Sequence, residues 1–140
     1  MPVLTGGQAL VQSLFREGVR LVLGVPGDGQ YEAVDALFQE PGIRYVSVRH
    51  EQAASYMADG YARAGGGIAG VLVVAGPGVL NAAAGMVTAN AVSSPMLVIT
   101  GTRHFRRRGP GEDEGAFLRE LATWSAAAQN PAQIPGLVRQ

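Results

Sequence analysis

The stretch between Arg63 and Arg103 contains no charged residue, and this limits the folds open to the whole chain. A membrane span needs roughly 20 continuous apolar residues. Here the Gly76-Pro77-Gly78 turn interrupts the stretch, and asparagine, serine and proline residues dilute its second half. We therefore interpret it as a strand at 69–75, a helix at 79–92 and a strand at 96–100. Such a segment is typical of the buried core of a soluble domain.

The remainder of the chain alternates between helical and extended patterns in the same way. Thr5 can cap a first helix that ends near Gly18. Further helices are expected at 31–39, at 51–64, shortly after a loose stretch that follows Thr102, and from 134 onward. Further extended segments are expected at 20–25, at 43–48 and, briefly, at 122–126.

The expected strands are nearly continuous apolar runs, which is typical of a parallel sheet covered on both faces. The sequence therefore predicts an α/β fold, a parallel sheet flanked by helices on both faces. We find no internal repeat and no linker, so residues 1–140 are expected to form one domain. The pattern stops while a further α/β unit is opening, and we expect this domain to be incomplete at its C-terminal end.

Composition excludes several classes of function. The formal net charge is zero, so no general attraction to nucleic acid or to anionic lipid is expected. There is no cysteine, which excludes disulfides and thiolate metal sites, and two histidines alone make a poor zinc site. The first residues, 1–7, lack the features of a signal peptide. We expect a cytoplasmic protein that binds neither membrane nor nucleic acid.

Glu51 is the first candidate for chemistry, because it stands where an extended run gives way to a helix rich in small residues. Its simplest role is electrostatic, since a carboxylate in a first turn complements the helix dipole by about 0.3–1 kcal/mol. The alternative is a buried carboxyl group that exchanges a hydrogen bond and a proton with a ligand nitrogen. His50 and His104 share no spacing and receive no catalytic role, and Arg106-Arg107-Arg108 is interpreted as a solvated loop.

Two glycine turns follow expected strands, where open α/β sheets bind ligands. Pro26-Gly27-Asp28-Gly29 follows the first strand, and Gly76-Pro77-Gly78 precedes Asn81 at the start of a helix. The second turn lacks the Lys and Ser/Thr of a phosphate loop, and Asn81 stands where a dinucleotide fingerprint requires its last glycine. A generic nucleotide-binding fold is therefore the weaker interpretation. Small residues at 82–85 and 89 permit close packing, within the domain or between subunits.

Taken in order, these motifs resemble the N-terminal pyrimidine-binding domain of thiamin-diphosphate enzymes, with acetolactate synthase the nearest group. Pyruvate oxidase and benzoylformate decarboxylase are more distant. The matching stretches cover nearly the whole chain. They are Glu17-Gly18-Val19, Gly24-Val25-Pro26-Gly27, Arg49-His50-Glu51, Ala58-Asp59-Gly60-Tyr61-Ala62-Arg63, Gly76-Pro77-Gly78 with Asn81, 95–101, Trp124-Ser125 and Ile134-Pro135.

The resemblance implies a cofactor, thiamin diphosphate, and a role for each matching residue. Glu51 would be the catalytic residue, with a hydrogen bond to ring nitrogen N1′ of the aminopyrimidine that promotes proton removal from C2 of the thiazolium ring. The resulting C2 ylide would attack the carbonyl of a 2-oxo acid such as pyruvate, and the thiazolium ring would store the electron pair released by decarboxylation. Pro26, Gly27, Gly78 and Asn81 match positions that line the pyrimidine or the subunit contact. A homodimer or larger homo-oligomer is implied.

No metal ligand is expected in this chain. In the family, a Gly-Asp-Gly followed by an Asn one helix later holds magnesium, but the first Asn after Asp28 is Asn81. Mg²⁺ is therefore expected on the diphosphate-binding domain, which is absent here together with the family's middle domain. Where acetolactate synthases have Phe-Gln-Glu, this chain has Phe117-Leu118-Arg119, which argues against acetohydroxyacid synthesis.

Two functions remain open at this stage. The chain is expected to be the pyrimidine-binding half of a 2-oxo acid decarboxylase or carboligase, inactive as a fragment. Alternatively, it is a stand-alone interaction or regulatory module with the same fold.

Overall fold

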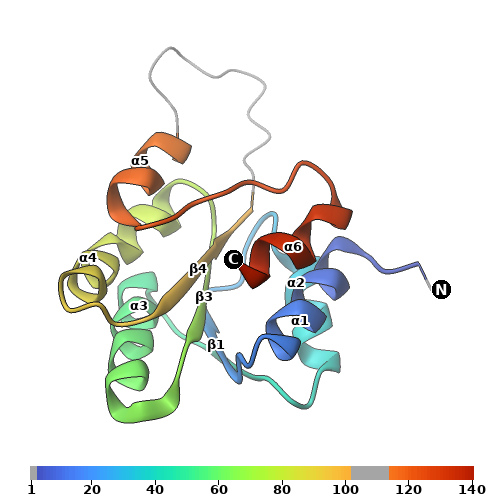
Figure 1. The fold of residues 1–140 in the computed structure, drawn as a ribbon, viewed down its shortest axis with the longest axis horizontal. Coiled ribbons are helices and arrows are strands. Elements are labelled where there is room, and N and C mark those ends of the chain that lie inside the picture. Colours follow the sequence, from blue (N-terminus) through green and yellow to red (C-terminus); the bar gives the residue numbers. More distant parts are fainter. Residues whose placement is uncertain (1–2, 102–113) are drawn as a thin grey trace.

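Four parallel strands form the centre of the molecule, in the order β2-β1-β3-β4 (Figure 1). The computed structural model describes residues 3–101 and 114–140, and of 114–116 it describes only the backbone. The strands are β1 (Leu21–Gly24), β2 (Arg44–Ser47), β3 (Ala69–Val73) and β4 (Met96–Thr100). The α-helices are α1 (Gly6–Arg16), α2 (Tyr31–Gln39), α3 (Glu51–Tyr61), α4 (Pro77–Ala91), α5 (Glu114–Leu121) and α6 (Ile134–Arg139). A π-helical turn, η1 (Ala62–Gly66), follows α3, and a 3₁₀ turn, η2 (Pro131–Gln133), precedes α6.

Helices cover both faces of the sheet, as the sequence predicts. Alternate strand residues point to opposite faces, so Val22 joins one apolar cluster and Leu23 the other. The cluster around Val22 lies against α1 and α2, and the cluster around Leu23 lies against α3 and α4. Figure 1 shows α1, α2 and α6 on one side of the strands and α3, α4 and α5 on the other.

The crossovers explain where a ligand site can form. The chain passes from β1 through α2 to β2 on one face, then returns through α3 to β3 on the other. The direction in which successive strands are added to the sheet therefore reverses between β1 and β3. Open α/β sheets bind ligands at such a point, beyond the carboxyl ends of the strands. The segments that leave these two strands are 25–30 and 74–76, and Glu51 opens the helix after β2.

Except for the segment at 122–126, the expected elements are found, with small differences at their ends. The helix expected at 79–92 begins earlier, at Pro77, because proline is well suited to the first helical position, where an N–H would have no partner. The helix expected to reach residue 64 ends as an α-helix at Tyr61 and continues as η1. Thr5 caps α1 as predicted, in a reciprocal pair of hydrogen bonds with Gln8.

The expected extended segment at 122–126 is not part of the sheet. It has no strand assignment, and Leu118 and Leu121 of the preceding α5 pack against the α3–α4 side of the core instead. An extended pattern becomes a strand only when a neighbouring strand accepts its hydrogen bonds, and none of the described strands pairs with this segment. His104 and the arginine run 106–108 lie outside the described residues.

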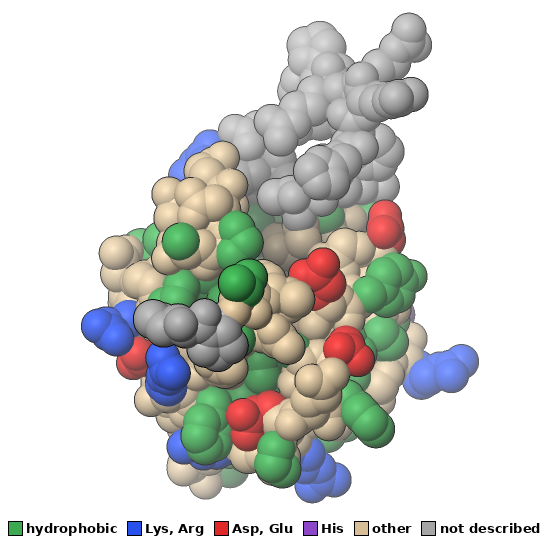
Figure 2. Space-filling model, turned by 90° about the vertical axis from the view of Figure 1, so that its right-hand side faces the viewer, with side chains coloured by type: hydrophobic (Ala, Val, Ile, Leu, Met, Phe, Trp, Pro, Cys, Tyr) green, Lys and Arg blue, Asp and Glu red, His purple; other side chains and the backbone are tan. Residues whose placement is uncertain are grey.

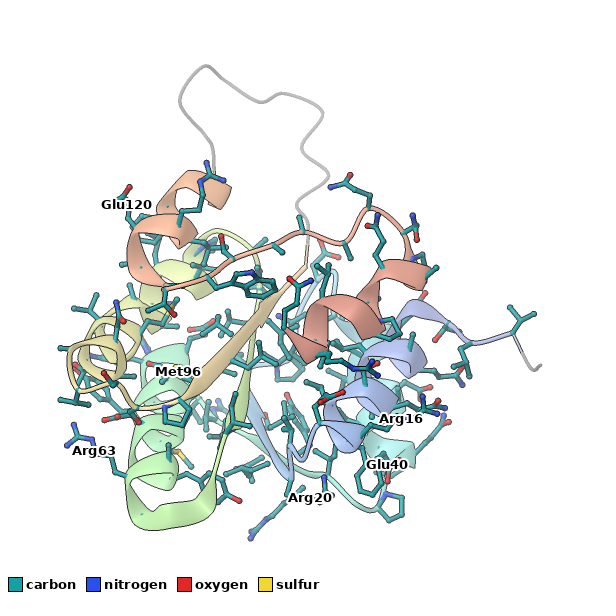
Figure 3. The ribbon with its side chains drawn as sticks, viewed as in Figure 1. Arg16, Arg20, Glu40, Arg63, Met96 and Glu120 are labelled. Carbon is teal, nitrogen blue, oxygen red and sulfur yellow. The ribbon has the colours of Figure 1, made fainter. Side chains whose placement is uncertain are left out.

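Apart from the buried Glu51 and Asp59, the charged side chains of the described residues are exposed or partly exposed. Arg16, Arg20, Glu40 and Glu120 project outward from the layers (Figure 3), and the Arg20 guanidinium lies over the Phe15 ring at 4.3 Å from its centroid. On the side that carries α1, α2 and α6, acidic and basic groups are interspersed with hydrophobic ones (Figure 2). Among the described residues, no helix has the length and apolar character required to cross a membrane.

Candidate functional site

A buried carboxylate lies beyond the carboxyl ends of the strands. Glu51 is the first residue of α3 and is only 9% exposed. The side-chain amide of Asn81, in α4, donates from Nδ2 to Oε2 of Glu51 at 2.9 Å. Among the described residues, no donor reaches Oε1, so one oxygen of Glu51 is anchored and the other is available. The first-turn position alone does not account for a carboxylate buried and held in this way.

Gly78 lies directly beside this available oxygen. A Cβ built on Gly78 would lie 3.4 Å from Oε1 of Glu51 and 2.8 Å from Cγ2 of Val74. The space next to the carboxylate therefore depends on the missing side chain. Gly78 is buried in the first turn of α4, whose start is fixed by Gly76 at a φ of 77° and by Pro77.

The turn after β1 contacts Val74, the residue that also lies against Gly78. A Cβ on Gly27 would overlap the Cγ1 atom of Val74, so the two turns pack directly against each other. Farther along, Gly29 (φ 77°) lies against Gly101, just beyond β4. The β1–α2 turn thus passes over the end of β3 and contacts the segments that follow both β3 and β4.

The five predicted site residues are not all equivalent in the structure. It brings together Glu51, Gly78 and Asn81 directly, and it joins Gly27 to them through Val74. Pro26 lies on the same turn but is exposed, and within the described residues no hydrogen bond links it to Glu51. Val74 was not singled out from the sequence, because an apolar residue after a buried strand resembles any other core position.

The position of Glu51 against Asn81 is maintained by close packing of α3 and α4. Ser55 and Gly85 each lie four residues, one helical turn, beyond Glu51 and Asn81. A Cβ on Gly85 would lie 2.6 Å from the Cβ of Ser55, which is fully buried. Only glycine permits the two helices to approach so closely here.

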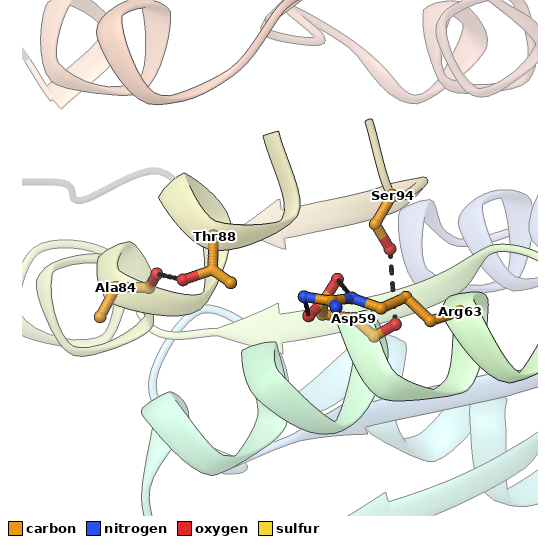
Figure 4. A network of polar contacts seen from close by, with 5 residues as sticks. All are labelled: Asp59, Arg63, Ala84, Thr88 and Ser94. Atoms are coloured by element: carbon orange, nitrogen blue, oxygen red, sulfur yellow. Dashed lines mark hydrogen bonds and ion pairs between the residues drawn. The ribbon is translucent and has the colours of Figure 1, made fainter. Parts of the chain in front are cut away.

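A polar network closes the far end of this helix pair (Figure 4). Arg63 holds the buried Asp59 carboxylate with two 3.1 Å contacts, from Nε to Oδ1 and from Nη2 to Oδ2. The hydrogen bond from Arg63 is the main reason that the pKa of Asp59 lies below its usual value. Ser94, in the turn before β4, donates from Oγ to the main-chain oxygen of Asp59 at 3.4 Å and from its main-chain N–H to Ala89 at 2.8 Å.

The described residues contain no group of three or more His, Asp or Glu side chains that would hold a metal ion. Asp28, which the sequence gives no metal-binding role, is exposed on the β1–α2 turn. Phe117, Leu118 and Arg119 lie in α5, where Leu118 packs against the core and Phe117 is 37% exposed.

Comparison with known families decides the relationship. Residues 4–128 match the family described as thiamine pyrophosphate enzyme, N-terminal TPP binding domain. The chain belongs to this family. Thiamine pyrophosphate is another name for thiamin diphosphate, so the resemblance deduced from the motifs is confirmed, as is the α/β fold expected from it.

Individual relatives point to two kinds of enzyme. The chain is 42% identical to a probable 2-ketoarginine decarboxylase of Pseudomonas aeruginosa, over 96% of this chain and 25% of that protein. It is 48% identical to the acetolactate synthase isozyme 3 large subunit of Escherichia coli, over 72% of this chain and 18% of that protein. The acetolactate synthase large subunit of Haemophilus influenzae gives the same values. The chain thus spans a quarter or less of the length of these relatives.

Proposed function

We propose that this chain supplies the pyrimidine-binding half of a thiamin-diphosphate site in a 2-oxo acid decarboxylase or carboligase. The observation that carries the proposal is the buried Glu51 carboxylate, which Asn81 holds at one oxygen while the other faces the bare backbone of Gly78. Family membership supports it, because the matched region is the TPP-binding domain.

The residues at this site fit an aminopyrimidine. Oε1 of Glu51, which accepts no hydrogen bond from the described residues, is the kind of group that a ring nitrogen needs as a proton partner. Gly27 and Gly78 lack side chains beside Val74, so a flat ring can approach the backbone there. We infer that Glu51, Gly78 and Asn81 hold the pyrimidine, and that Pro26 and Gly27 line it or the contact with a second subunit.

The cofactor and the residues of this chain then have separate roles. When bound, thiamin diphosphate supplies a thiazolium ring that accepts the electron pair released as a 2-oxo acid loses CO₂. Glu51 holds or accepts a proton at Oε1, while the Asn81 hydrogen bond keeps Oε2 occupied and the carboxylate in one orientation. Proton transfer by a positioned side chain of this kind contributes about 10²–10⁴-fold to a rate.

The remaining parts of the site are proposed to lie outside this chain. We propose that a further domain holds Mg²⁺ and the diphosphate, because the chain spans a quarter or less of the length of its relatives, and that the 140-residue chain by itself is inactive. We also propose a homodimer or larger assembly in the cytoplasm. In support of an assembly, α3 and α4, the helices that carry Glu51 and Asn81, expose apolar side chains, including Tyr56, Met57, Leu80 and Val87 at 43–60%.

The substrate is proposed to be a 2-oxo acid such as pyruvate. The aligned region of the Pseudomonas relative is longer than that of the acetolactate synthases, 96% against 72% of this chain. The name of the Pseudomonas relative specifies 2-ketoarginine, a 2-oxo acid that carries a guanidinium group. Decarboxylation of a larger, basic 2-oxo acid is therefore the second candidate reaction.

A fusion protein tests the proposal. The chain replaces the matching segment of the Pseudomonas relative, and CO₂ release is measured with thiamin diphosphate, Mg²⁺ and either pyruvate or 2-ketoarginine. We expect activity from the fusion, a loss of about 10²–10⁴-fold with Glu51→Gln, and none from the chain alone. Decarboxylation or carboligation by the chain alone contradicts inactivity, and full activity of the Glu51→Gln fusion contradicts the role of Glu51.

The alternative, a stand-alone interaction or regulatory module, has a different expected outcome. A folded fusion without activity, whether or not Glu51 is replaced, favours this alternative. Calorimetric titration with NAD tests the nucleotide-binding interpretation. We expect no NAD binding, and tight binding would favour that interpretation.

A further inference from the structure

His50 begins α3 and contributes both its backbone and its side chain to the helix end. Its main-chain oxygen accepts from Ala53 at 3.0 Å and from Ala54 at 3.4 Å. Its backbone is extended, with φ −154° and ψ 137°, and its Nδ1 accepts from the main-chain N–H of Gln52 at 3.1 Å. Ser, Thr, Asp and Asn normally occupy such an N-cap, so an imidazole in this place needs an explanation.

The hydrogen bond from Gln52 to His50 closes a ring that contains the main chain of Glu51. Glu51 is thereby held at two points: its carboxylate by Asn81 on α4, and its backbone by the cap that spans it. The first residue of a helix is otherwise where fraying begins, because the initial N–H groups have no partner within the helix.

We propose that His50 is a positioning residue, whose Nδ1 cap fixes the backbone of Glu51 so that its carboxylate stays against Asn81. The effect on catalysis rests on the function proposed above, whereas the capping itself does not. Because Nδ1 accepts a hydrogen bond, it carries no proton, and the neutral ring is the Nε2–H tautomer. Nδ1 is thus engaged in the cap and is not available as a base.

Side-chain geometry provides a selective test. In asparagine, Oδ1 is bonded to Cγ in the place that Nδ1 occupies in histidine, so His50→Asn retains the acceptor. In His50→Gln the amide is one bond longer, and in His50→Ala there is no acceptor. Thr5→Ala is the matched control, because Thr5 caps α1 by the same kind of bond, far along the chain from Glu51.

The first measurements use the 140-residue chain without cofactor. Nitrogen chemical shifts should show the Nε2–H tautomer at His50, which the His50→Asn spectrum distinguishes from the other histidine, His104. Loss of an N-cap should speed hydrogen exchange of the Gln52 amide about 2- to 30-fold in His50→Ala and His50→Gln. His50→Asn should leave it within about twofold. An Nδ1–H tautomer, or equally fast exchange in all three variants, overturns the capping role.

The second measurements use the fusion protein. We expect His50→Ala and His50→Gln to lower kcat severalfold with little change in KM for the 2-oxo acid, His50→Asn to restore kcat, and Thr5→Ala to leave it unchanged. A His50→Asn fusion as impaired as His50→Ala overturns the positioning role. If Glu51→Gln proves harmless, the proposed function fails, but the exchange rates at Gln52 still decide whether His50 is the cap.

Discussion

The side-chain amide of Asn81 donates a 2.9 Å hydrogen bond to the buried carboxylate of Glu51, and the two residues begin neighbouring helices. This bond joins the segment after β2 to the segment after β3 across the carboxyl edge of the sheet. It restricts Glu51 to one orientation before any ligand is present. Under the function proposed above, this fixed orientation is the preorganisation that a proton-transferring group requires.

Replacing Asn81 should weaken the fold measurably. Asn81→Ala leaves Oε2 of the buried carboxylate without its donor, and we expect a loss of about 1 kcal/mol in the free energy of unfolding. Urea denaturation measures it. Asn90→Ala is the control, because Asn90 is exposed on the same helix and the gain in helix propensity is similar. Equal stability of the two variants would show that the Asn81 bond contributes nothing.

Replacement of Gly85 and of Gly60 by alanine should change the stability of the chain in opposite directions. Gly85→Ala inserts a methyl group against the buried Ser55 and should destabilise the chain by about 1–3 kcal/mol. Gly60→Ala meets no atom within 4 Å and should stabilise α3 by about 0.5–1 kcal/mol. Thermal denaturation of both variants distinguishes a packing effect from helix propensity, which alone predicts that both become more stable.

Asp59 should make stability depend on pH in the acid range. Its pKa is lowered in the folded state by Arg63, from a usual value of 3.8. The stabilisation is therefore fully present above about pH 4–5 and is lost as the pH falls through the lower, folded-state pKa. We expect the stability difference between the unmodified chain and Asp59→Asn to shrink in that range. Arg63→Gln should reduce the same pH dependence, and an unaltered profile would argue against the ion pair as its cause.

Self-association should depend on the exposed α3–α4 surface. Leu80 is 60% exposed there, and Leu80→Arg should weaken association at least about tenfold, as expected when a charge enters an apolar contact. Phe38→Arg is the control, because Phe38 is 90% exposed on α2, on the other face of the sheet. Sedimentation equilibrium at several concentrations measures both. Greater weakening by Phe38→Arg would place the contact on the α2 side.

The order of elements follows from sequence because nearly continuous apolar runs alternate with helical patterns, and the central strand β3 is buried throughout, whereas the edge strand β2 is only partly covered. The relation of Glu51 to Gly78 and Asn81 was also accessible, through the matching motifs. Two features of the site were not. Val74 has no sequence signal of its own, and the sequence gives His50 no catalytic role because it shares no spacing with His104. The segment at 122–126 has an extended pattern, but a pattern does not specify which strand, if any, will pair with it.

The close approach of Ser55 and Gly85 has a consequence for which changes of length this protein tolerates. Glu51, Ser55 and Asp59 occur at four-residue steps on α3, and Asn81, Gly85 and Ala89 occur at the same steps on α4. One residue inserted within either helix rotates everything beyond it by about 100°, which would turn Glu51 or Asn81 away from its partner. Insertions between Gly65 and Ile68 leave both sets of steps intact. Within this part of the chain, length variation is therefore expected at 65–68 and not between Glu51 and Ser55 on α3 or between Asn81 and Gly85 on α4.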